Sequence, residues 1–413
     1  MTATPTLARL LAGPPSKAGA EHLEAHRARL GGLPPVGDRR EIIPILEASG
    51  LLGRGGAAFP VGRKWRVVAE RSQGDAVVVV NGAEGEPRSA KDRVLMTCRP
   101  HLVLDGALVA ADAVGANEIV LYVGGEHRAA HRALGRALVE REPELRGRVR
   151  LVAAPVGYVA GEATAVVHFL NTGDARPTFL EQRPHEAGVG GRPTLVQNVE
   201  SLAYAALIAR HGDAWYRSAG RGQTPGTALV TVSGAVPRPG VREIEYGLTI
   251  AEVATLAGTA ADGPSAVLVG GYFGGWASLD EVRDRPLDPA DRAAGGLGFG
   301  CGVVSFAGPD TCGVRATAEI MTFMAGESAA QCGPCVFGLA AIAEATLRLA
   351  NGAAADDDLE RIDRWAGQVQ GRGACHHPDG AIGLLSSARA VFADEFARHQ
   401  ARGRCSVAHA AVA

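Results

Sequence analysis

Three cysteines in the last third of the 413-residue sequence have a spacing that suits metal binding. Cys332 and Cys335 are separated by two residues, and Cys375 follows much later. Two thiolates spaced in this way at the start of a helix can converge on an iron–sulfur cluster, and a distant third can close the cage. The pair also suits zinc or a redox-active disulfide, or all three could pack as small apolar residues. The other four cysteines match no metal spacing: Cys98, Cys301, Cys312 and Cys405.

A glycine-rich segment in the first part of the chain suits a phosphate group. Gly53, Gly55 and Gly56 lie close together, and Lys64 follows eight residues later. Glycines let backbone amides converge on an anion without intervening side chains, and a lysine adds positive charge at the rim. Because short glycine motifs are weak signals, a flexible surface turn is the alternative.

Polar residues follow a strand that we predict over residues 76–80. Asn81, Glu84 and Glu86 come directly after this apolar, β-branched run. The carboxyl end of a buried parallel strand is where ligand-binding residues lie in α/β sheets. An asparagine can donate and accept hydrogen bonds, as the ring edge or ribityl chain of a flavin requires. A solvated charged loop is the alternative interpretation.

Two further segments carry polar residues next to glycines. Residues 157–165 include Gly161 and Glu162 after another predicted strand, and residues 191–200 include Gln197 and Asn198. Taken alone, the first is also typical of a turn with a helix cap, and the second of a polar helix start. These four segments are the candidate binding motifs of the chain.

The elements around these motifs alternate between strand and helix from residue 41 to about 210. This alternation predicts a mostly parallel, doubly wound sheet. Strands are predicted over 76–80, 118–123 and 149–156, with helices over 100–114 and 127–142.

The second half of the chain has a different pattern. Short strands over 229–233 and 241–245 flank a turn-forming stretch, and Thr249 with Glu252 forms a capping box that opens a helix. Beyond a glycine-rich stretch the chain is predicted to be helical from about 314 to 400, with a polar break at 351–358. The predicted organisation is an N-terminal arm (1–40), an α/β domain (41–225), a β-β-α insert (226–290), a linker with a helical domain (291–400) and a tail (401–413).

Composition excludes several classes of protein. A formal net charge of −2 and a pI of about 6.6 give no attraction to nucleic acid or to anionic membranes. The sequence has no apolar run near the roughly 20 residues that span a bilayer, and no basic leader of a signal peptide. We therefore expect a cytoplasmic protein, and the odd number of cysteines argues against structural disulfides.

Taken in order, the four motifs resemble the flavin subunit of NADH:quinone oxidoreductase (complex I, the 51-kDa type) and related hydrogenase and formate dehydrogenase subunits. The family pattern G-R-G-G-A-G-F-P-x-G-x-K-W is matched at 53–65, and N-x-D-E-x-E-P-x-x-x-K-D-R at 81–93. The resemblance extends over about residues 40–400. It implies a Rossmann-like flavin domain, a β-grasp (SLBB-like) insert and a C-terminal helical iron–sulfur domain.

The resemblance also assigns cofactor-binding residues. Phe59 matches a ring that stacks on the adenine of NADH, and Glu86 matches a ribose-binding carboxylate. Gln197 replaces an asparagine of the family but can still donate and accept hydrogen bonds. The residues implied for flavin mononucleotide (FMN) are Gly53, Arg54, Gly55, Gly56, Lys64, Asn81, Glu84, Gly161, Glu162, Gln197 and Asn198.

Departures from the family pattern fall on the NADH side. Each lost aromatic partner removes roughly 0.5–1.5 kcal/mol of binding free energy, in addition to the energy from its buried area. Two losses would weaken binding by about 5- to 150-fold. We therefore predict that FMN is kept and that NADH binds weakly or not at all. The departures are Val67 for a Phe, Ala83 for an Asp, Ala163 for a Glu, and the stretch 183–187, where His185 is the best substitute for a Phe.

The cysteines match the family pattern E-S-C-G-x-C-x-P-C with one exception. Cys332, Cys335 and Cys375 are kept, but Ala329 stands where the first ligand belongs. Three outcomes remain open: a three-iron cluster, a four-iron (4Fe-4S) cluster with an unusual fourth ligand, or no cluster. Candidates for that ligand are a nitrogen of His376 or His377 and the oxygen of Ser328.

The preferred function is that of an oxidoreductase subunit that passes electrons between FMN and an iron–sulfur cluster. Its expected partners are other redox subunits, a ferredoxin, or a membrane redox complex that it would join at the inner face of the membrane. One alternative is an electron-transfer adaptor without dehydrogenase activity, resembling the peripheral subunit of ion-translocating ferredoxin:NAD oxidoreductases. The other is a scaffold that holds neither cofactor.

Overall fold

The computed structural model describes residues 8–15, 19–33, 41–179, 183–259, 263–290 and 298–403. Cys405 and most of the predicted tail lie outside these residues. The chain divides into two compact units. The first is Met1–Thr231 with Val241–Leu248 and Asp288–Ala290, and the second is Val232–Gly240 with Thr249–Leu287 and Asp291–Ala413.

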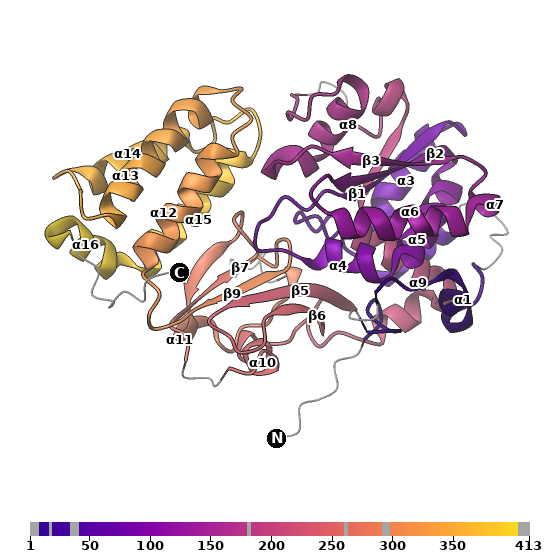
Figure 1. Ribbon diagram of the computed structural model, residues 1–413, viewed down its shortest axis with the longest axis horizontal. Helices are drawn as coiled ribbons and strands as arrows, with labels where there is room; N and C mark the ends of the chain where they lie inside the picture. The colour runs from indigo at the N-terminus through magenta and orange to yellow at the C-terminus, as the bar shows by residue number, and fades with distance from the viewer. Residues whose placement is uncertain are drawn as a thin grey trace. The chain divides into compact units, whose positions relative to one another are not determined.

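A four-stranded parallel sheet forms the centre of the first unit (Figure 1). Its strand order is β3-β2-β1-β4, with β1 at Ala76–Gly82, β2 at Ala116–Gly124, β3 at Val149–Ala154 and β4 at Thr194–Asn198. All three neighbouring pairs are parallel. The predicted strands are confirmed, whereas β4 was not predicted because its last two residues are polar and suggested a helix start.

Both faces of this sheet are apolar and covered by helices. Val78 and Val80 of β1 belong to one hydrophobic core, and Val77 and Val79 belong to another. Because successive residues of a strand point to opposite faces, β1 is buried from both sides, as in a doubly wound sheet. The first core includes α2 (Ile42–Ser49), α3 (Val61–Arg71), α5 (Pro100–Val114), α6 (Arg128–Glu140) and α9 (Val199–Arg217), and the second includes α8 (Ala163–Thr172). Two shorter helices of this unit are α4 (Lys91–Cys98) and α7 (Glu142–Leu145).

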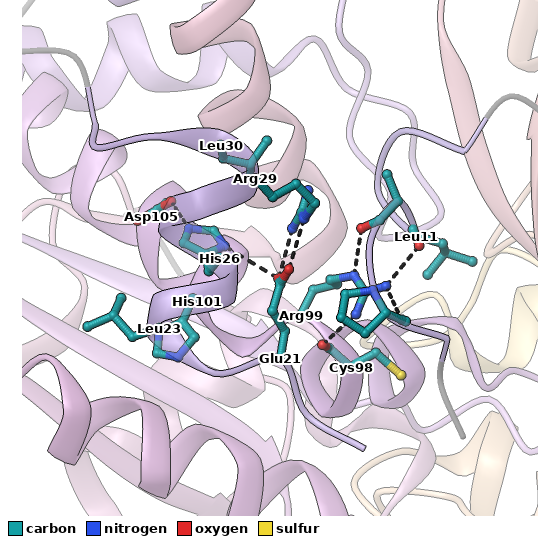
Figure 2. A network of polar contacts seen from close by, with 12 residues as sticks. Leu11, Glu21, Leu23, His26, Arg29, Leu30, Cys98, Arg99, His101 and Asp105 are labelled. Atoms are coloured by element: carbon teal, nitrogen blue, oxygen red, sulfur yellow. Dashed lines mark hydrogen bonds and ion pairs between the residues drawn. The ribbon is translucent and has the colours of Figure 1, made fainter. Parts of the chain in front are cut away.

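The N-terminal helix α1 (Leu23–Leu30) is held against α5 by buried polar contacts, as Figure 2 shows. His26 Nε2 lies 2.7 Å from an Asp105 oxygen, and its other ring nitrogen lies 3.5 Å from Glu21. Both guanidinium bonds from Arg29 to Glu21 measure 2.8 Å. The same figure shows Arg99 donating to the carbonyl oxygens of residues 11, 14 and 98, which fixes the segment before α1.

A second sheet has five strands in the order β6-β5-β9-β7-β8. The capping box predicted from Thr249 and Glu252 is present at the start of α10. The sheet extends beyond the predicted insert, because β9 lies after residue 290. The elements of this region are β5 (Thr227–Gly234), β6 (Gly240–Glu245), α10 (Ile250–Leu256), β7 (Ala266–Val269), β8 (Gly275–Ser278), α11 (Leu279–Val282) and β9 (Val303–Ala307).

The C-terminal part of the second unit is helical, as predicted, and is drawn in orange and yellow in Figure 1. Its helices pack through buried side chains such as Met321, Leu339 and Leu385. A π-helical turn at Pro334–Leu339 leads into α13, and the predicted polar break separates α13 from α14. The helices are α12 (Gly313–Gly326), α13 (Ala340–Ala350), α14 (Asp358–Val369), α15 (His377–Val391) and α16 (Ala393–Arg402).

Among the described residues, no single helix has the length and apolar character needed to cross a membrane. Only α4 and α5 taken as a pair, bent by 97°, meet those criteria of length and composition.

Candidate cofactor sites

The glycine-rich segment forms a closed loop immediately before α3. The Gly53 amide donates to the Phe59 carbonyl at 2.9 Å, and the Val61 amide donates to the Leu51 carbonyl at the same distance. Gly56 has a φ of +100°, a conformation that side chains rarely allow. A Cβ added to Gly55 would meet nothing nearer than the Cβ of Asn198, 4.0 Å away. The loop therefore leaves open space beside Asn198, next to the amino end of a helix, where anions bind well.

The Arg54 side chain points from this loop into the protein interior. Its guanidinium donates to the Tyr216 hydroxyl and to the Thr227 carbonyl, each at 3.0 Å. Its Nε lies 3.4 Å from a Glu200 carboxylate oxygen. The backbone amide of Arg54 also bonds to the Ser201 hydroxyl at 3.0 Å. Because these bonds all go to other groups of the protein, Arg54 anchors the glycine loop to the interior.

Buried charges connect the glycine loop to two other motifs. Glu200 pairs with Lys91 at 3.0 Å as well as with Arg54. Lys91 also pairs with Asp92 at 2.7 Å, and Asp92 accepts a hydrogen bond from the Asn198 amide group at 2.7 Å. Burial opposes a charge on Lys91, but Asp92 and Glu200 outweigh it and raise the pKa of the lysine. The first, second and fourth motifs thus share one ion-pair network, which we call the Glu200 network (Arg54, Lys91, Asp92, Asn198, Glu200).

Sequence reasoning missed Lys91, Asp92 and Glu200 as functional supports. They occur within the matched family patterns, but only the fold shows that their charges meet. The available signal was the charge itself, because Glu200 stands shortly before the apolar run 202–209 of helix α9.

Two predicted site residues use their carboxylates as helix caps. Glu84 accepts hydrogen bonds from the amides of Asp92 and Arg93, both at 3.1 Å, at the start of α4. Glu162 accepts from the amides of Thr164 and Ala165 at the start of α8. Negative side chains stabilise the amino end of a helix, so these residues shape the loops that precede α4 and α8.

Three amide side chains meet at the carboxyl ends of β1 and β4. Asn81 is the register partner of Asn198, and Gln197 is that of Val80, so all three lie at one edge of the sheet. The Asn81 amide donates to the Gly161 carbonyl at 2.8 Å, which joins the third motif to the same edge. The structure therefore brings the four predicted motifs together.

Lys64 and Gln197 supply polar atoms that suit a bound cofactor. The Lys64 ammonium donates to the carbonyl of Val196, and burial lowers its pKa to about 8. Gln197 is only 4% exposed, and its Oε1 has no hydrogen-bond partner among the described residues. Buried polar atoms are rarely left unpaired, so this edge of the sheet lacks a donor that a ligand would provide. A phosphate with a hydrogen-bonding ring, as in FMN, fits this set of groups.

The two residues that the resemblance assigns to NADH differ in exposure. Phe59 is 47% exposed, and the Arg63 guanidinium lies 5.8 Å from the centre of its ring. Glu86 is buried and accepts a hydrogen bond from the Tyr158 hydroxyl at 3.1 Å. Sequence reasoning overlooked Phe179, which is 89% exposed and close in sequence to the stretch where a Phe was expected.

His185, the predicted substitute for that Phe, lies near Lys64. Burial lowers the pKa of His185, and the positive charges of Arg71 and Lys64 lower it further. Its position is therefore compatible with the predicted site.

The three predicted cluster ligands gather in the second unit. Burial and, to a smaller extent, the neighbouring Cys332 and Cys375 outweigh a hydrogen bond from Ser328 and raise the pKa of the Cys335 thiol to about 11. Among the described residues, no three His, Cys, Asp or Glu side chains lie close enough to hold a single metal ion. Three thiols are nevertheless a ligand set that suits an iron–sulfur cluster.

The position of the missing ligand lies in a tight turn. Ala329 is followed by Ala330, whose φ is +54°. The Ala330 amide donates to the Ser328 hydroxyl oxygen at 3.0 Å, and the Ser328 hydroxyl hydrogen-bonds to the Cys335 thiol. His377 is buried, with its Nε2 2.7 Å from the Met324 carbonyl, and His376 is exposed.

Comparisons with known proteins match the two regions of the chain that contain these residues. Residues 46–206 match the family model of the Nuo51 FMN-binding domain, and residues 315–399 match that of the NADH-ubiquinone oxidoreductase-F iron-sulfur binding region. The F 2 subunit of the NADH-quinone oxidoreductase of Rhizobium meliloti (strain 1021) is 31% identical over 382 residues, or 88% of this chain and 90% of the relative. The mitochondrial NADH dehydrogenase [ubiquinone] flavoprotein 1 of Dictyostelium discoideum is 30% identical over 393 residues, or 87% and 79%.

Solved structures give the same result. An NAD+-reducing [NiFe]-hydrogenase in its H2-reduced state has a chain that superposes with a TM-score of 0.81 at 30% identity. The match covers 89% of this chain but only 63% of the hydrogenase chain. The similarity therefore includes nearly the whole of the present fold and leaves over a third of the hydrogenase chain unmatched.

Proposed function

The chain belongs to the family of the NADH-quinone oxidoreductase F subunit, and from that premise we propose that it passes electrons between FMN and an iron–sulfur cluster while binding NADH weakly. The observation that carries the flavin assignment is the carboxyl end of β4, where Lys64 donates to the Val196 carbonyl, the Gln197 Oε1 has no partner among the described residues, and Gly55 leaves open space beside Asn198. A cation and an unpaired amide oxygen at that edge suit a phosphorylated flavin better than an apolar ligand.

In this proposal each group of the flavin site has its own task. The backbone amides of Gly53, Gly55 and Gly56 and the Lys64 ammonium bind the phosphate, while Gln197 orients the ring or the ribityl chain. The Glu200 network and the two carboxylate caps keep the loops in place. Bound FMN supplies the ability to exchange either two electrons or one. The protein contributes orientation, charge and exclusion of water, and no acid–base residue is required.

The cluster site would use Cys332, Cys335 and Cys375 as ligands. Cys335 interacts with both Cys332 and Cys375, and cluster binding would require deprotonation of the three thiols. Burial disfavours the free thiolate of Cys335, and positively charged iron would reverse that effect.

The weak binding of NADH is a proposal about this member of the family. Val67, Ala83 and Ala163 stand where the family pattern has a Phe, an Asp and a Glu. Loss of one stacking ring costs roughly 0.5–1.5 kcal/mol of binding free energy, in addition to the energy from the area it buries. This loss corresponds to about 2- to 10-fold in affinity. An adaptor that receives electrons from a ferredoxin is the second candidate, and the same substitutions favour it.

Anaerobic titration of the purified protein with NADH tests both parts. We expect a flavin absorbance spectrum that micromolar NADH bleaches slowly or not at all. Val67→Phe should lower the half-saturating NADH concentration by about 2- to 10-fold. Val139→Phe, on the exposed face of α6, is the matched control and should change nothing. Rapid bleaching of the wild type by micromolar NADH would refute weak binding, and a colourless protein that takes up no added FMN would refute the flavin site.

Partners and location follow from the same proposal. The relatives are subunits of larger enzymes, so this chain is proposed to act with other redox subunits, a ferredoxin or a membrane redox complex. Assignment of residues 226–290 to the β-grasp (SLBB-like) class and a cytoplasmic location, peripheral to the inner face of a membrane through partners, belong to this proposal.

A further inference from the structure

We propose that the hydroxyl oxygen of Ser328 is the fourth ligand of the iron–sulfur cluster, beside the thiolates of Cys332, Cys335 and Cys375. This inference rests on the proposed function, because it requires a cluster at these cysteines. It goes further by naming a ligand that the sequence pattern leaves unassigned, since Ala329 has no atom that can bind iron.

The contacts of Ser328 place its oxygen within the cysteine group. Its hydroxyl hydrogen-bonds to the Cys335 thiol, which in turn interacts with Cys332 and Cys375. The Oγ atom also accepts a hydrogen bond from the Ala330 amide at 3.0 Å. Ser328 is therefore already fixed in an orientation that directs its oxygen toward the sulfur atoms.

The local backbone fixes the position of Ser328 near the cysteines. Helix α12 ends at Gly326, and the Ser328 amide still bonds to the Ala325 carbonyl at 3.4 Å. The positive φ of Ala330 then turns the chain sharply toward Cys332. This turn holds the serine oxygen between the end of α12 and the π-helical turn that carries Cys335.

The two histidines next to Cys375 are weaker candidates. His377 directs Nε2 to the Met324 carbonyl at 2.7 Å, and its ring packs edge-on against Phe273 at 6.1 Å. That hydrogen bond occupies Nε2, so only Nδ1 could bind iron, whereas the Ser328 hydroxyl already contacts Cys335. His376 is exposed at the start of α15, and no described contact of its ring with the cysteines supports it.

Ligation by serine is a ligand exchange and needs no oxidant or reductant. The O–H bond of Ser328 breaks and its proton goes to water, while the Oγ–iron bond forms in place of an iron–water bond. A bound cation lowers the pKa of a coordinated hydroxyl strongly, which makes this deprotonation possible near neutral pH. Oxygen is a harder ligand than sulfur, so it suits the more oxidised form of the iron.

Iron and sulfide analysis with electron paramagnetic resonance (EPR) spectroscopy of the full-length protein, reconstituted anaerobically, tests the inference. We expect the wild type to hold a four-iron cluster and Ser328→Ala to lose one iron and show the spectrum of a three-iron cluster. Ala329→Cys restores the ligand of the family pattern. The double variant Ser328→Ala with Ala329→Cys should therefore regain the fourth iron, which a general folding defect of Ser328→Ala would prevent.

Glu327→Gln is the matched control, because it changes the side chain next to Ser328 without removing a proposed ligand and should leave four irons in place. The inference is overturned if Ser328→Ala keeps four irons with an unchanged EPR spectrum, if Glu327→Gln loses iron equally, or if the wild type holds only three irons. These results would leave the cluster itself intact. Absence of iron from every variant, including Ala329→Cys, would instead refute the cluster and with it the proposed function.

Discussion

The glycine loop at residues 53–56 and the cysteine loop at residues 327–335 are both proposed to hold a cofactor, but they are supported in different ways. The glycine loop is anchored by Arg54 to Glu200, far along the chain, within a buried network of charges. The cysteine loop has hydrogen bonds between close neighbours, such as Ala330 to Ser328 and Val336 to Cys332.

This contrast indicates how each loop responds to substitution. A buried charge that loses its partner destabilises the whole unit, so the flavin loop and its supports depend on one another. A loop closed by local bonds can lose a side chain at Ala329 without exposing any charge. We therefore expect changes near the flavin site to affect stability, and changes in the cysteine loop to affect mainly the cluster.

The largest effect should come from Glu200→Gln. The substitution leaves Arg54 and Lys91 buried with one carboxylate fewer, and breaking a buried ion pair typically costs about 3–5 kcal/mol. Urea unfolding of the purified protein measures this loss, and retained FMN measures the displacement of the glycine loop. Glu47→Gln is the control, because it breaks an exposed pair with Arg66 and should cost less than about 1 kcal/mol. Equal losses in the two variants would contradict the contrast.

The next largest effect should come from Lys64→Met. Removing a charge-assisted hydrogen bond to the phosphate costs about 1.5–3 kcal/mol, or about 10- to 150-fold in FMN affinity. Because burial lowers the pKa of Lys64 to about 8, its positive charge is lost as pH rises through that value. FMN binding to the cofactor-free protein should therefore weaken above about pH 8.

Quenching of flavin fluorescence at several pH values measures this dependence. The dependence should disappear in Lys64→Met and persist in Arg66→Met, which removes a charge from an exposed position of the same helix. An unchanged pH profile in Lys64→Met would show that the phosphate binds elsewhere.

The third prediction concerns helix α1 of the first unit, whose anchoring should depend on pH. Burial lowers the pKa of His26, but Asp105 and Glu21 outweigh it and raise the pKa above the usual 6.5. Burial opposes the charge on both carboxyl groups, yet their hydrogen bonds with His26 and with arginines lower each pKa to about 2. The contribution of His26 to folding stability is complete below pH 6.5 and is lost as pH rises through its raised pKa. The contribution of the two carboxylates to stability is complete above about pH 4.5 and is lost as pH falls toward 2.

Hydrogen-exchange protection of Leu23–Leu30 should therefore be greatest between about pH 4.5 and pH 6.5 and should fall above that range. His26→Phe should remove this fall and cost about 1–3 kcal/mol at about pH 6. His22→Phe, an exposed neighbour, is the control. Protection that falls equally with pH in His26→Phe would refute the assignment.

The sequence predicted the location of the flavin site better than the tasks of its side chains. The strand over 76–80 placed Asn81 at the carboxyl end of a strand, as found, and the resemblance assigned Gly161, Gln197 and Asn198 to the same site, although the position of the last two on β4 was not predicted. The same reasoning assigned ligand roles to Arg54 and Glu84, although these side chains hold the loop and cap α4. Short motifs show which residues are near a ligand, but the direction of each side chain depends on distant partners.

The missed elements have a similar cause. β4 ends in Gln197 and Asn198, and β9 follows a glycine-rich stretch, so neither stood out by apolar pattern and length. Each is a strand because its neighbours in the sheet complete its hydrogen bonds, and those neighbours are far away in sequence. The helical domain was predicted more accurately because local periodicity and caps define helices.

The smallest effect on stability should come from Ala330→Gly in the cysteine loop. We expect a gain, in contrast to the loss expected for Glu200→Gln near the glycine loop. Ala330 has a φ of +54°, which costs an L-residue about 1–2 kcal/mol relative to the right-handed conformation. Glycine removes that strain but loses more entropy on folding, so the net gain should be about 0.5–1 kcal/mol. Thermal unfolding of the cofactor-free protein measures the gain, and Ala341→Gly within α13 should show a loss of similar size. A loss in both variants would mean that the turn at Ala330 is not strained, and that the cysteine loop is held as firmly as the glycine loop.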